Sequence, residues 1–474
     1  MNTKLLKQKI LDLAIRGKLT QQLKSDGNTA DLLKEISSAC HPERSAKGTK
    51  SKDPGTIIPL DKSEAPFEIP ANWEWVHLQD VGELSRGQSK HRPRNDPALY
   101  VDGFMPFVQT GDVAGAEKGL ICKWHSLYNE LGVAQSRIWP RGTICITIAA
   151  NIGDVALLNF DACFPDSVVG FNAYKPIYSN KFFLFYLMLC KEKLDEKSRS
   201  TAQKNINIDI LSQIYVPLPP LAEQQRIVAK IEEAFAEIEA IEKNKELLKT
   251  HIKQTRQKIL DLAIHGKLVP QNKSDEPASV LLERITRDNP HYEKLTDVPF
   301  EIPESWEWVK LGDVCSFFGG GTPDKSNPKY WNGSINWASV KDIKGIELTD
   351  TVDKITEAGF EDSASSYAEK EDLILVTRIN PGMCIQTKIK TAINQDLKVV
   401  KVPSQINKVY VMVFCNYAQK WFLEKSSGTT VKGIKIDAVL QMPFPLPPLA
   451  EQKRIVDRVE EIFKSLDEIS LHLV

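Results

Sequence analysis

Apolar residues recur every seven positions, on two interleaved series, from Leu221 to about Ile264. Their alternating spacing of four and three residues is typical of the a and d positions of a coiled coil, so we predict one long helix here. Pro219-Pro220 precede this stretch and Gly266 follows it, as expected where a helix starts and stops. At about 1.5 Å per residue the helix would be roughly 60 Å long. A helix of that length with a single apolar stripe needs a partner helix.

The same chain supplies that partner in two pieces. The motif Pro-Leu-Pro-Pro-Leu-Ala-Glu-Gln at residues 217–224 recurs at 445–452, and the motif Gln-Lys-Ile-Leu-Asp-Leu-Ala-Ile at 257–264 recurs at 8–15. Such repeats indicate an antiparallel pair, with one continuous helix and one helix split between the two termini, which we expect to meet near its middle. The expected seam residues are Ile227, Ile231, Ile238, Ile241, Leu248, Ile252, Ile259, Ile455, Val459, Ile462 and Leu466.

A second repeat opens a globular segment in each half of the chain. The motif Pro-Phe-Glu-Ile-Pro-x-x-Trp-Glu-Trp-Val begins at Pro66 and again at Pro299. Alternation after the paired tryptophans predicts the first strand of a domain, and we expect these rings to pack in a core rather than stack on bases. Apolar runs predict strands at 107–108, 144–148, 155–158, 373–376 and 391–393, and helices at 182–193 and 411–423.

We therefore predict an α+β fold in which two α/β domains are separated by an antiparallel coiled coil with pseudo-twofold symmetry. Residues 20–62 are polar and carry turn signals, which favours a mostly flexible connector; an arm that contacts DNA through Arg44, Lys47, Lys50 and Lys52 is the alternative. The expected segments are the N-terminal part of the split helix (1–19), a linker (20–64), the first domain (65–220), the central helix (221–266), a second linker (267–297), the second domain (298–448) and the C-terminal part of the split helix (449–474).

Composition narrows the class of protein without selecting one. With 474 residues the chain has room for two or three domains, and 42% apolar with 26% charged residues is ordinary for a soluble globular protein. A net charge of −1 and a pI near 6.7 argue against a simple cationic nucleic-acid binder, although local patches can still bind phosphate. Eight scattered cysteines without Cys-x-x-Cys argue against zinc and disulfides and indicate a reducing cytoplasm. We find no signal peptide and no apolar run long enough to cross a membrane.

No sequence motif indicates catalysis. Residues 319–326 resemble a phosphate-binding loop, but Asp324 stands in place of the glycine before the lysine, and its carboxylate would repel phosphate. Dinucleotide-binding, zinc-protease and nucleophile-elbow motifs are absent, as is the Asn/Asp-Pro-Pro-aromatic loop with which an amino-methyltransferase holds its target base. We therefore predict neither catalytic residues nor metal ligands in this chain.

Loops with basic and amide side chains favour contact with nucleic acid instead. Residues 86–94 read Arg-Gly-Gln-Ser-Lys-His-Arg-Pro-Arg, with four positive charges and no acid. Such a loop can neutralise phosphates, and its Arg and Gln side chains can bond guanine or adenine edges, although a solvated surface loop is an equal alternative. Loops at 109–112, 319–341 and 378–382 add polar tips. The candidate DNA-binding residues are Arg86, Gln88, Ser89, Lys90, Arg92, Arg94, Gln109, Thr110, Lys204, Thr322, Lys325, Lys341, Arg378, Asn380 and Lys432.

Two of these lysines occupy the same place in a third repeat, at residues 201–209 and 429–437. Lys204 and Lys432 are kept while their surroundings differ, which would suit a phosphate contact that carries no sequence information. An ion pair with Asp209 or Asp437 explains the pattern equally well, so both interpretations stay open.

The combination of paired motifs resembles the specificity subunit of Type I restriction-modification systems. The openings Pro-Phe-Glu-Ile-Pro-x-x-Trp-Glu-Trp, the segments Leu-Pro-Pro-Leu-Ala-Glu-Gln-x-Arg-Ile-Val and the segments Gln-Lys-Ile-Leu-Asp-Leu-Ala-Ile each occur twice, over nearly the whole chain and in that family's order. The resemblance implies a target recognition domain, a central repeat helix, a second recognition domain and a terminal repeat helix.

The same resemblance implies a non-catalytic protein that reads two half-sites of double-stranded DNA and docks two methyltransferase and two restriction (motor-nuclease) subunits in the cytoplasm. It implies no cofactor in this chain, with S-adenosylmethionine, ATP and magnesium held by the partners. Unlike domains on a stiff helix would read an asymmetric target whose gap is set by helix length. Two other classes remain: a two-lobed coiled-coil scaffold that never reads DNA, and a self-sufficient methyltransferase, which the missing loops disfavour.

Overall fold

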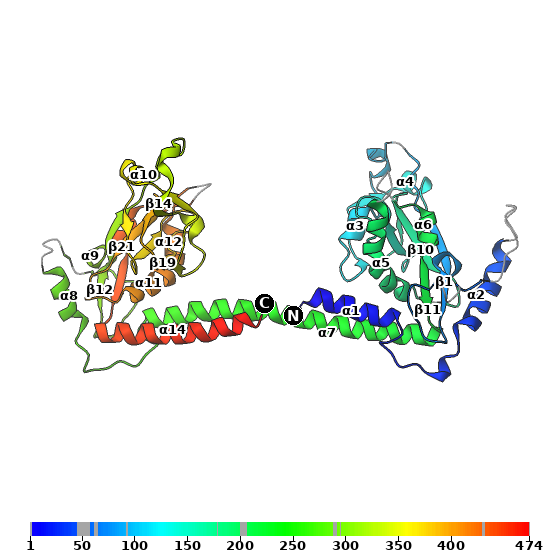
Figure 1. Cartoon of the computed structure of the whole chain (residues 1–474), viewed down its shortest axis with the longest axis horizontal. Helices are drawn as coiled ribbons and strands as arrows, with labels where there is room; N and C mark the ends of the chain where they lie inside the picture. Colours follow the sequence, from blue (N-terminus) through cyan, green and yellow to red (C-terminus); the bar gives the residue numbers. More distant parts are fainter. Residues whose placement is uncertain are drawn as a thin grey trace. The chain divides into compact units, whose positions relative to one another are not determined.

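The computed structural model describes residues 2–44, 57–60, 65–91, 93–177, 179–199, 206–287, 292–293, 295–428 and 432–473. It divides into two compact units, Met1–Asn244 and Lys245–Val474, called unit 1 and unit 2 below. Each unit contains one half of the longest helix and one of the two repeated globular segments (Figure 1).

The predicted long helix is confirmed as α7, which spans Leu221–Ile264 and has 44 residues. It ends where predicted because Gly266 adopts the left-handed conformation (φ +67°), which lets the Lys267 N–H donate to the Leu262 carbonyl at 2.8 Å. Helix α1 (Thr3–Ile15) ends in the same way, at Gly17 with φ +64°.

Each unit also confirms the predicted antiparallel pairing. In unit 1, α1 lies beside the first half of α7, and Lys7 near the start of α1 pairs with Glu242 at 3.2 Å (Figure 1). In unit 2, α14 (Leu449–Leu471) lies beside the second half of α7, where the Arg256 guanidinium stands 4.6 Å over the Phe463 ring. The meeting of the two termini involves both units at once and stays a prediction.

Most of the predicted seam residues are buried in these helix pairs. Ile227, Ile231, Ile238, Ile252, Ile455 and Val459 are at most 8% exposed, and Ile259, Ile462 and Leu466 are half-buried. The predictions for Ile241 and Leu248 are wrong, since these side chains are 47% and 39% exposed.

Helix length explains the two exceptions. Glu242 bonds the first turn of α1, so the preceding Ile241 lies where the pairing begins in unit 1. Arg256 pairs with Asp467, one turn before α14 ends, so Leu248 lies beyond the end of its partner helix in unit 2. The heptad pattern continues past the residues that could cover it.

Unit 1 contains two sheets and a separate strand pair, β1-β11. The five-stranded sheet has the order β2-β10-β7-β8-β4 and the four-stranded sheet the order β5-β3-β9-β6. The strands are β1 (Glu74–His77), β2 (Gly82–Arg86), β3 (Met105–Phe107), β4 (Leu120–Ile121), β5 (Ser126–Tyr128), β6 (Ile138–Trp139), β7 (Ile144–Thr147), β8 (Val155–Leu158), β9 (Ala162–Cys163), β10 (Val168–Ala173) and β11 (Tyr215–Leu218).

Unit 2 repeats this topology strand for strand, as β12-β22, β13-β21-β18-β19-β15 and β16-β14-β20-β17. The parallel strand pairs also correspond. The pair β4/β8 of unit 1 matches β15/β19 of unit 2, and the pair β3/β9 matches β14/β20. The strands are β12 (Glu307–Lys310), β13 (Ser316–Gly319), β14 (Trp331–Ala338), β15 (Glu347–Leu348), β16 (Asp353–Ile355), β17 (Tyr367–Ala368), β18 (Leu373–Val376), β19 (Cys384–Thr387), β20 (Thr391–Ile393), β21 (Leu397–Lys401) and β22 (Pro443–Leu446). The domain interiors therefore differ in sequence but share one fold.

The helices of the globular segments include those predicted. Helix α5 (Lys181–Arg199) confirms the prediction for unit 1, whereas the single helix predicted at 411–423 is two, α11 (Lys408–Tyr417) and α12 (Gln419–Lys425), which meet at Ala418. The short helices are α3 (Thr110–Ala114), α4 (Glu130–Ala134), α6 (Ile208–Ser212), α9 (Leu311–Val314), α10 (Glu357–Asp362) and α13 (Ile436–Leu440). No helix within the described ranges is both long and apolar enough to span a membrane.

The interpretation of residues 20–62 as a mostly flexible connector is wrong for residues 29–44, which form helix α2 (Thr29–Arg44). Its buried apolar residues, among the side chains that the structure describes, are Leu32, Leu33 and Ile36, and the second linker holds the matching helix α8 (Ala278–Thr286) with buried Ala278, Leu281 and Leu282. Both helices start against the domain opening, where the Thr29 N–H donates to the Asn72 carbonyl at 3.0 Å and the Ala278 N–H to the Ser305 carbonyl at 2.9 Å. The basic residues 47, 50 and 52 lie outside the described residues.

A buried carboxylate joins three parts of each unit. In unit 1, Glu223 at the start of α7 accepts hydrogen bonds from Trp73 Nε1 at 2.8 Å and from the Gln22 side chain. In unit 2, Glu451 at the start of α14 accepts from Trp306 Nε1 at 3.0 Å and from Gln271. All the paired tryptophans are buried, which confirms their predicted place in the core.

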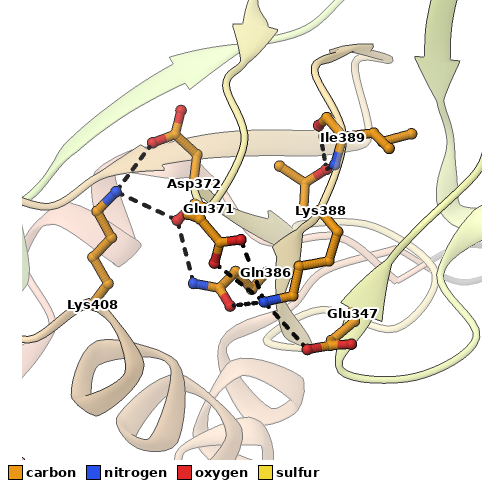
Figure 2. Close-up of polar contacts among 8 residues, drawn as sticks. Glu347, Glu371, Asp372, Gln386, Lys388, Ile389 and Lys408 are labelled. Carbon is orange, nitrogen blue, oxygen red and sulfur yellow. Dashed lines mark hydrogen bonds and ion pairs between the residues drawn. The ribbon is translucent and has the colours of Figure 1, made fainter.

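Charged residues form a network in unit 2 at the start of β18 (Figure 2). Lys388 lies 3.1 Å from Glu371 and 3.3 Å from Glu347, and Lys408 lies 3.6 Å from the buried Asp372. Asp372 is also paired with a lysine of β21. Two cations therefore compensate the cost of burying this carboxylate.

Unit 1 fills the corresponding place with neutral groups. Asn172 on β10 donates to Thr143 Oγ1 at 3.1 Å, and Asn180 donates to Asn172 Oδ1 at 3.1 Å. Matching strand registers show that Thr143 corresponds to Asp372. The same fold thus tolerates either a neutral or an ionic solution, provided that the buried polar atoms are bonded.

The buried glutamate of unit 2 makes stability depend on pH. Burial raises the pKa of Glu451, against the opposing effect of the hydrogen bonds from Trp306 and Gln271. The folded state then binds the proton more readily than the unfolded state, so stability falls as pH rises from about 4.5 through the folded pKa. Glu451→Gln removes this titration. As pH rises through this window, the free energy of unfolding of the variant should therefore increase relative to that of wild type. Urea unfolding between about pH 4 and pH 8 measures the difference.

The control is Glu460→Gln, on the exposed side of the same helix. Its stability should follow that of wild type at every pH. A constant offset between Glu451→Gln and wild type over the whole range would contradict the expected titration.

Candidate nucleic-acid interface

Four loops leave equivalent strand ends in the two units, and most of the residues predicted from sequence lie on them; Lys204 and Lys432 belong to a separate segment before α6 and α13. The first loop follows β2 in unit 1 and β13 in unit 2, the second follows β3 and β14, and the third follows β9 and β20. The fourth loop joins β7 to β8 in unit 1 and β18 to β19 in unit 2. The loop that starts at residue 86 and the one that starts at residue 319 are therefore the same loop of the fold in two copies. So are residues 109–112 and 339–342, where a buried aspartate accepts the first N–H of the turn at 2.8 Å in both units.

In unit 2 the four loops surround a cavity of about 520 Å³. Three of the predicted residues, Thr322, Lys325 and Lys341, line it. The other lining residues are Trp331, Trp337, Ser339, Val340, Asp353, Ile379, Asn394, Gln395 and Asp396. The cavity is thus bordered by cations, acids, amides and two indoles, which can offer both donors and acceptors.

The remaining predicted residues of unit 2 lie beside this cavity. Arg378 forms an ion pair at 3.2 Å with the lining residue Asp396. Asn380 is two residues further along the same turn, and the Lys432 carbonyl accepts a hydrogen bond from the Ile379 N–H at 2.9 Å. The structure therefore brings the predicted residues of unit 2 to one surface.

The cations of this surface fall into two groups. Lys341 pairs with Asp353 at 2.6 Å, and this hydrogen bond raises the pKa of Lys341. Lys325 and Lys432 are exposed, and neither forms an ion pair with any residue that the structure describes. The proposed structural pair between Lys432 and Asp437 is therefore not formed. Unpaired lysines on a surface are available for phosphates.

The loop after β13 is held by its own residues. Asp324 accepts hydrogen bonds from the Ser326 N–H at 2.9 Å and the Ser326 hydroxyl at 2.8 Å, which lower the pKa of Asp324. Trp331 Nε1 donates to the Asp324 carbonyl at 3.1 Å and Trp337 Nε1 to the Gly321 carbonyl at 3.0 Å. The two indoles brace the loop, with ring centroids 5.3 Å apart in an edge-to-face arrangement.

Both copies of this loop begin with a glycine that the fold requires. A Cβ on Gly320 would lie 2.1 Å from the Asn394 carbonyl oxygen, and one on Gly87 would lie 2.2 Å from the Phe164 carbonyl oxygen. Only glycine lets the loop pass so close to the neighbouring chain. The glycine therefore fixes where the variable part of the loop starts.

The predicted residues of unit 1 are only partly on the surface. Arg86, Gln88 and Lys90 are exposed, whereas Ser89 is buried beside the Tyr128 hydroxyl at 3.4 Å and does not fit the predicted contact with DNA. Arg94 is paired with Asp166, on the loop after β9. Gln109 is exposed and Thr110 half-buried at the start of α3. Arg92 and Lys204 lie outside the described residues.

Sequence reasoning missed parts of two loops. In unit 2 it missed Ile379 and residues 394–396, and in unit 1 it missed the turn at 148–153. Ala150 and Ile379 occupy equivalent positions, and both adopt the left-handed conformation, with φ +61° and +73°. The Asn-x-Gly motif at 151–153 and again at 380–382 was the available signal, since Asn and Gly favour tight turns. In both turns the glycine N–H closes the turn at 2.9 Å.

Among the described residues, no group of three or more His, Cys, Asp or Glu side chains is arranged to hold a metal ion. The surface is instead suited to recognition, with free cations for phosphates and amide groups for base edges.

Comparison with known proteins agrees with this geometry. The family model for the Type I restriction modification DNA specificity domain matches residues 70–249 and 303–472. The EcoAI and EcoEI specificity subunits of Escherichia coli are each 24% identical to this chain, over 98% and 99% of its length and 90% of their own. The crystal structure of the HsdS subunit from Thermoanaerobacter tengcongensis shares the fold, with a TM-score of 0.53 and 19% identity over 87% of this chain and 94% of that one. The chain therefore belongs to the family of Type I restriction-modification DNA specificity subunits, the non-catalytic component of such systems.

Proposed function

We propose that each unit reads one half-site of a bipartite, asymmetric DNA target through its four loops. The observation that supports this proposal is a shared loop frame that carries different residues. Gln109 corresponds to Ser339, and Gly111 corresponds to Lys341, although the buried aspartate that caps each turn is the same. Because the donors and acceptors differ at matching positions, the two units would select different bases.

The loop residues divide into two roles in this proposal. Exposed cations that form no ion pair with a described residue would contact phosphates and carry most of the affinity: Arg86, Lys90, Lys325 and Lys432. Amide and hydroxyl groups at the loop tips would read base edges: Gln88, Gln109, Thr110, Thr322, Asn380 and Gln395. Arg94, Lys341 and Arg378 are oriented by their acidic partners and would act beside these tips.

Membership of the family supports the rest of the assembly. We propose that this chain joins two methyltransferase subunits and two restriction subunits in the cytoplasm. S-adenosylmethionine, ATP and magnesium would be held by those partners, and this chain would contribute the choice of target and the spacing of its halves. A scaffold that never reads DNA is the competing function, and it would show no preference between specific and random duplexes.

Replacing an unpaired lysine tests the phosphate contacts. Lys325→Ala should weaken binding to specific and random duplexes alike and reduce the slope of log affinity against log salt by about 1, since each phosphate contact releases about 0.9 counterion. The measurement is fluorescence anisotropy over a salt series, with the chain assembled with its methyltransferase subunits and the target mapped from genomic methyladenine.

Lys370→Ala is the matched control, because this exposed lysine lies before β18 whereas the cavity lies beyond the other end of that strand. It should leave the slope unchanged. Equal slopes for all three proteins would remove Lys325 from the interface, and equal affinity of wild type for specific and random duplexes would favour the scaffold.

The length of α7 should set the gap between the half-sites. Inserting seven residues after Asn244 adds about 10 Å of helix and nearly two complete turns, so the gap should lengthen by about 3 base pairs while both half-sites stay the same. Sequencing methyladenine in cells that carry the variant reads the gap directly.

The control insertion has two residues, which turns one half of the helix by about 200° relative to the other. It should abolish methylation at any bipartite site. An unaltered gap in the seven-residue variant would refute the role of α7 as a spacer.

A methyl-transfer assay distinguishes this chain from a self-sufficient methyltransferase. The purified chain, mixed with DNA and labelled S-adenosylmethionine, should transfer no methyl group until the methyltransferase subunits are added. Transfer by the chain alone would overturn its assignment as non-catalytic.

A further inference from the structure

Ile379 combines three properties that rarely occur together. Its side chain is 61% exposed, it lines the cavity of unit 2, and its backbone is left-handed with φ +73°. A β-branched residue is disfavoured in this conformation, and an exposed isoleucine gains nothing from burial. The position therefore costs stability without contributing to the core, which is typical of a residue kept for a functional contact.

Hydrogen bonds fix the backbone around Ile379. The Ile379 N–H donates to the Lys432 carbonyl at 2.9 Å, the Asn380 N–H donates to the Arg378 carbonyl at 2.9 Å, and the Gly382 N–H closes the turn. On one side the Arg378 guanidinium is paired with an aspartate, and on the other Asn380 Oδ1 accepts from Gln419 at 3.1 Å. A stiff apolar group thus projects between two fixed polar residues.

Most of the other residues that line the cavity are polar, and the two indoles are bonded to the loop after β13. The remaining apolar residue of the lining, Val340, is half-buried against the core, so Ile379 is the exposed apolar residue among them. Base edges in the major groove offer donors and acceptors for such polar groups, and they offer one apolar feature, the 5-methyl group of thymine. Insertion of the side chain between base pairs is less compatible with the turn, because its neighbours along the chain, Arg378 and Asn380, are polar and already bonded to Asp396 and Gln419.

We propose that Ile379 packs against the 5-methyl group of a thymine in the half-site read by unit 2, which makes it a specificity-determining residue. This proposal rests on the proposed DNA-reading function of the loops. Lys432 and Lys325 would hold the phosphates on either side, and Arg378 and Asn380 would bond the neighbouring base edges.

Unit 1 supplies an internal comparison. Ala150 stands at the equivalent position with the same left-handed backbone, φ +61°, but offers only one methyl group. Both units therefore form the same turn, but only unit 2 has a large apolar side chain on it. Contact with a thymine methyl group through this turn is therefore expected to be strong in unit 2 and weak in unit 1.

The test replaces each thymine of the mapped target, one at a time, by deoxyuridine, which keeps the base pair and removes the methyl group. The chain is assembled with its methyltransferase subunits, and binding is measured by competition. For wild type, one replacement should weaken binding about three- to tenfold, the effect of losing one buried methyl contact. For Ile379→Ala, the same replacement should have less than about a twofold effect, since the contact is already lost.

Ile346→Ala is the matched control, because Ile346 is also an exposed isoleucine of unit 2 (59%) but does not line the cavity. It should retain the full sensitivity of wild type to deoxyuridine. Ile379→Ala should be at least as stable as wild type, because alanine lowers the backbone strain. A thermal melt of the variant therefore shows whether weaker binding comes from the lost contact or from misfolding.

A mapped target without thymine, or sensitivity to deoxyuridine that is the same in wild type and Ile379→Ala, would overturn the proposal. So would an increase in 2-aminopurine fluorescence that depends on Ile379 without any effect of deoxyuridine, since this would show insertion between bases. Failure of the proposed function looks different, because wild type would then not distinguish the mapped target from random duplex at all.

Discussion

The buried carboxylates at Glu223 and Glu451 are the constraint on which the rest of each unit depends. A carboxylate removed from water has to be hydrogen-bonded, and its donors come from two other stretches of the chain. One donor is the indole that opens the domain, and the other is a glutamine in the segment that follows α1 or α7. This explains why three motifs with three different repeat distances occur together. Two of them contain the glutamate and the indole, and the third ends the helix that precedes the glutamine.

The frame built on this interaction is distinct from the loops that form the proposed DNA-reading surface. Strand order, strand direction and the positions of the loops are the same in both units, while the loop residues differ. The interior tolerates large changes as well, since a neutral network around Thr143 replaces the ionic one around Asp372. The loop residues can therefore change without moving the strands that support them.

Much of the fold was accessible from sequence because its signals are local. The heptad spacing located α7, identical motifs located both domain openings, and Gly266 located the end of the long helix. The helix α2 was missed because its apolar residues are few and lie in a polar segment full of turn signals. Its buried face becomes evident only when it is packed against the domain opening.

By itself the sequence determined the paired long helices, the repeats, the family and which residue types could meet DNA, because periodicity and motif identity depend on neighbours along the chain. Only the tertiary structure decided which loops correspond, that Ser89 is buried and Ile379 exposed, and that Ile241 and Leu248 have no cover within their units. The reason is physical: exposure and proximity are set by strands and helices that are distant in sequence, and no local pattern records where a partner helix ends or which side of a turn faces the solvent.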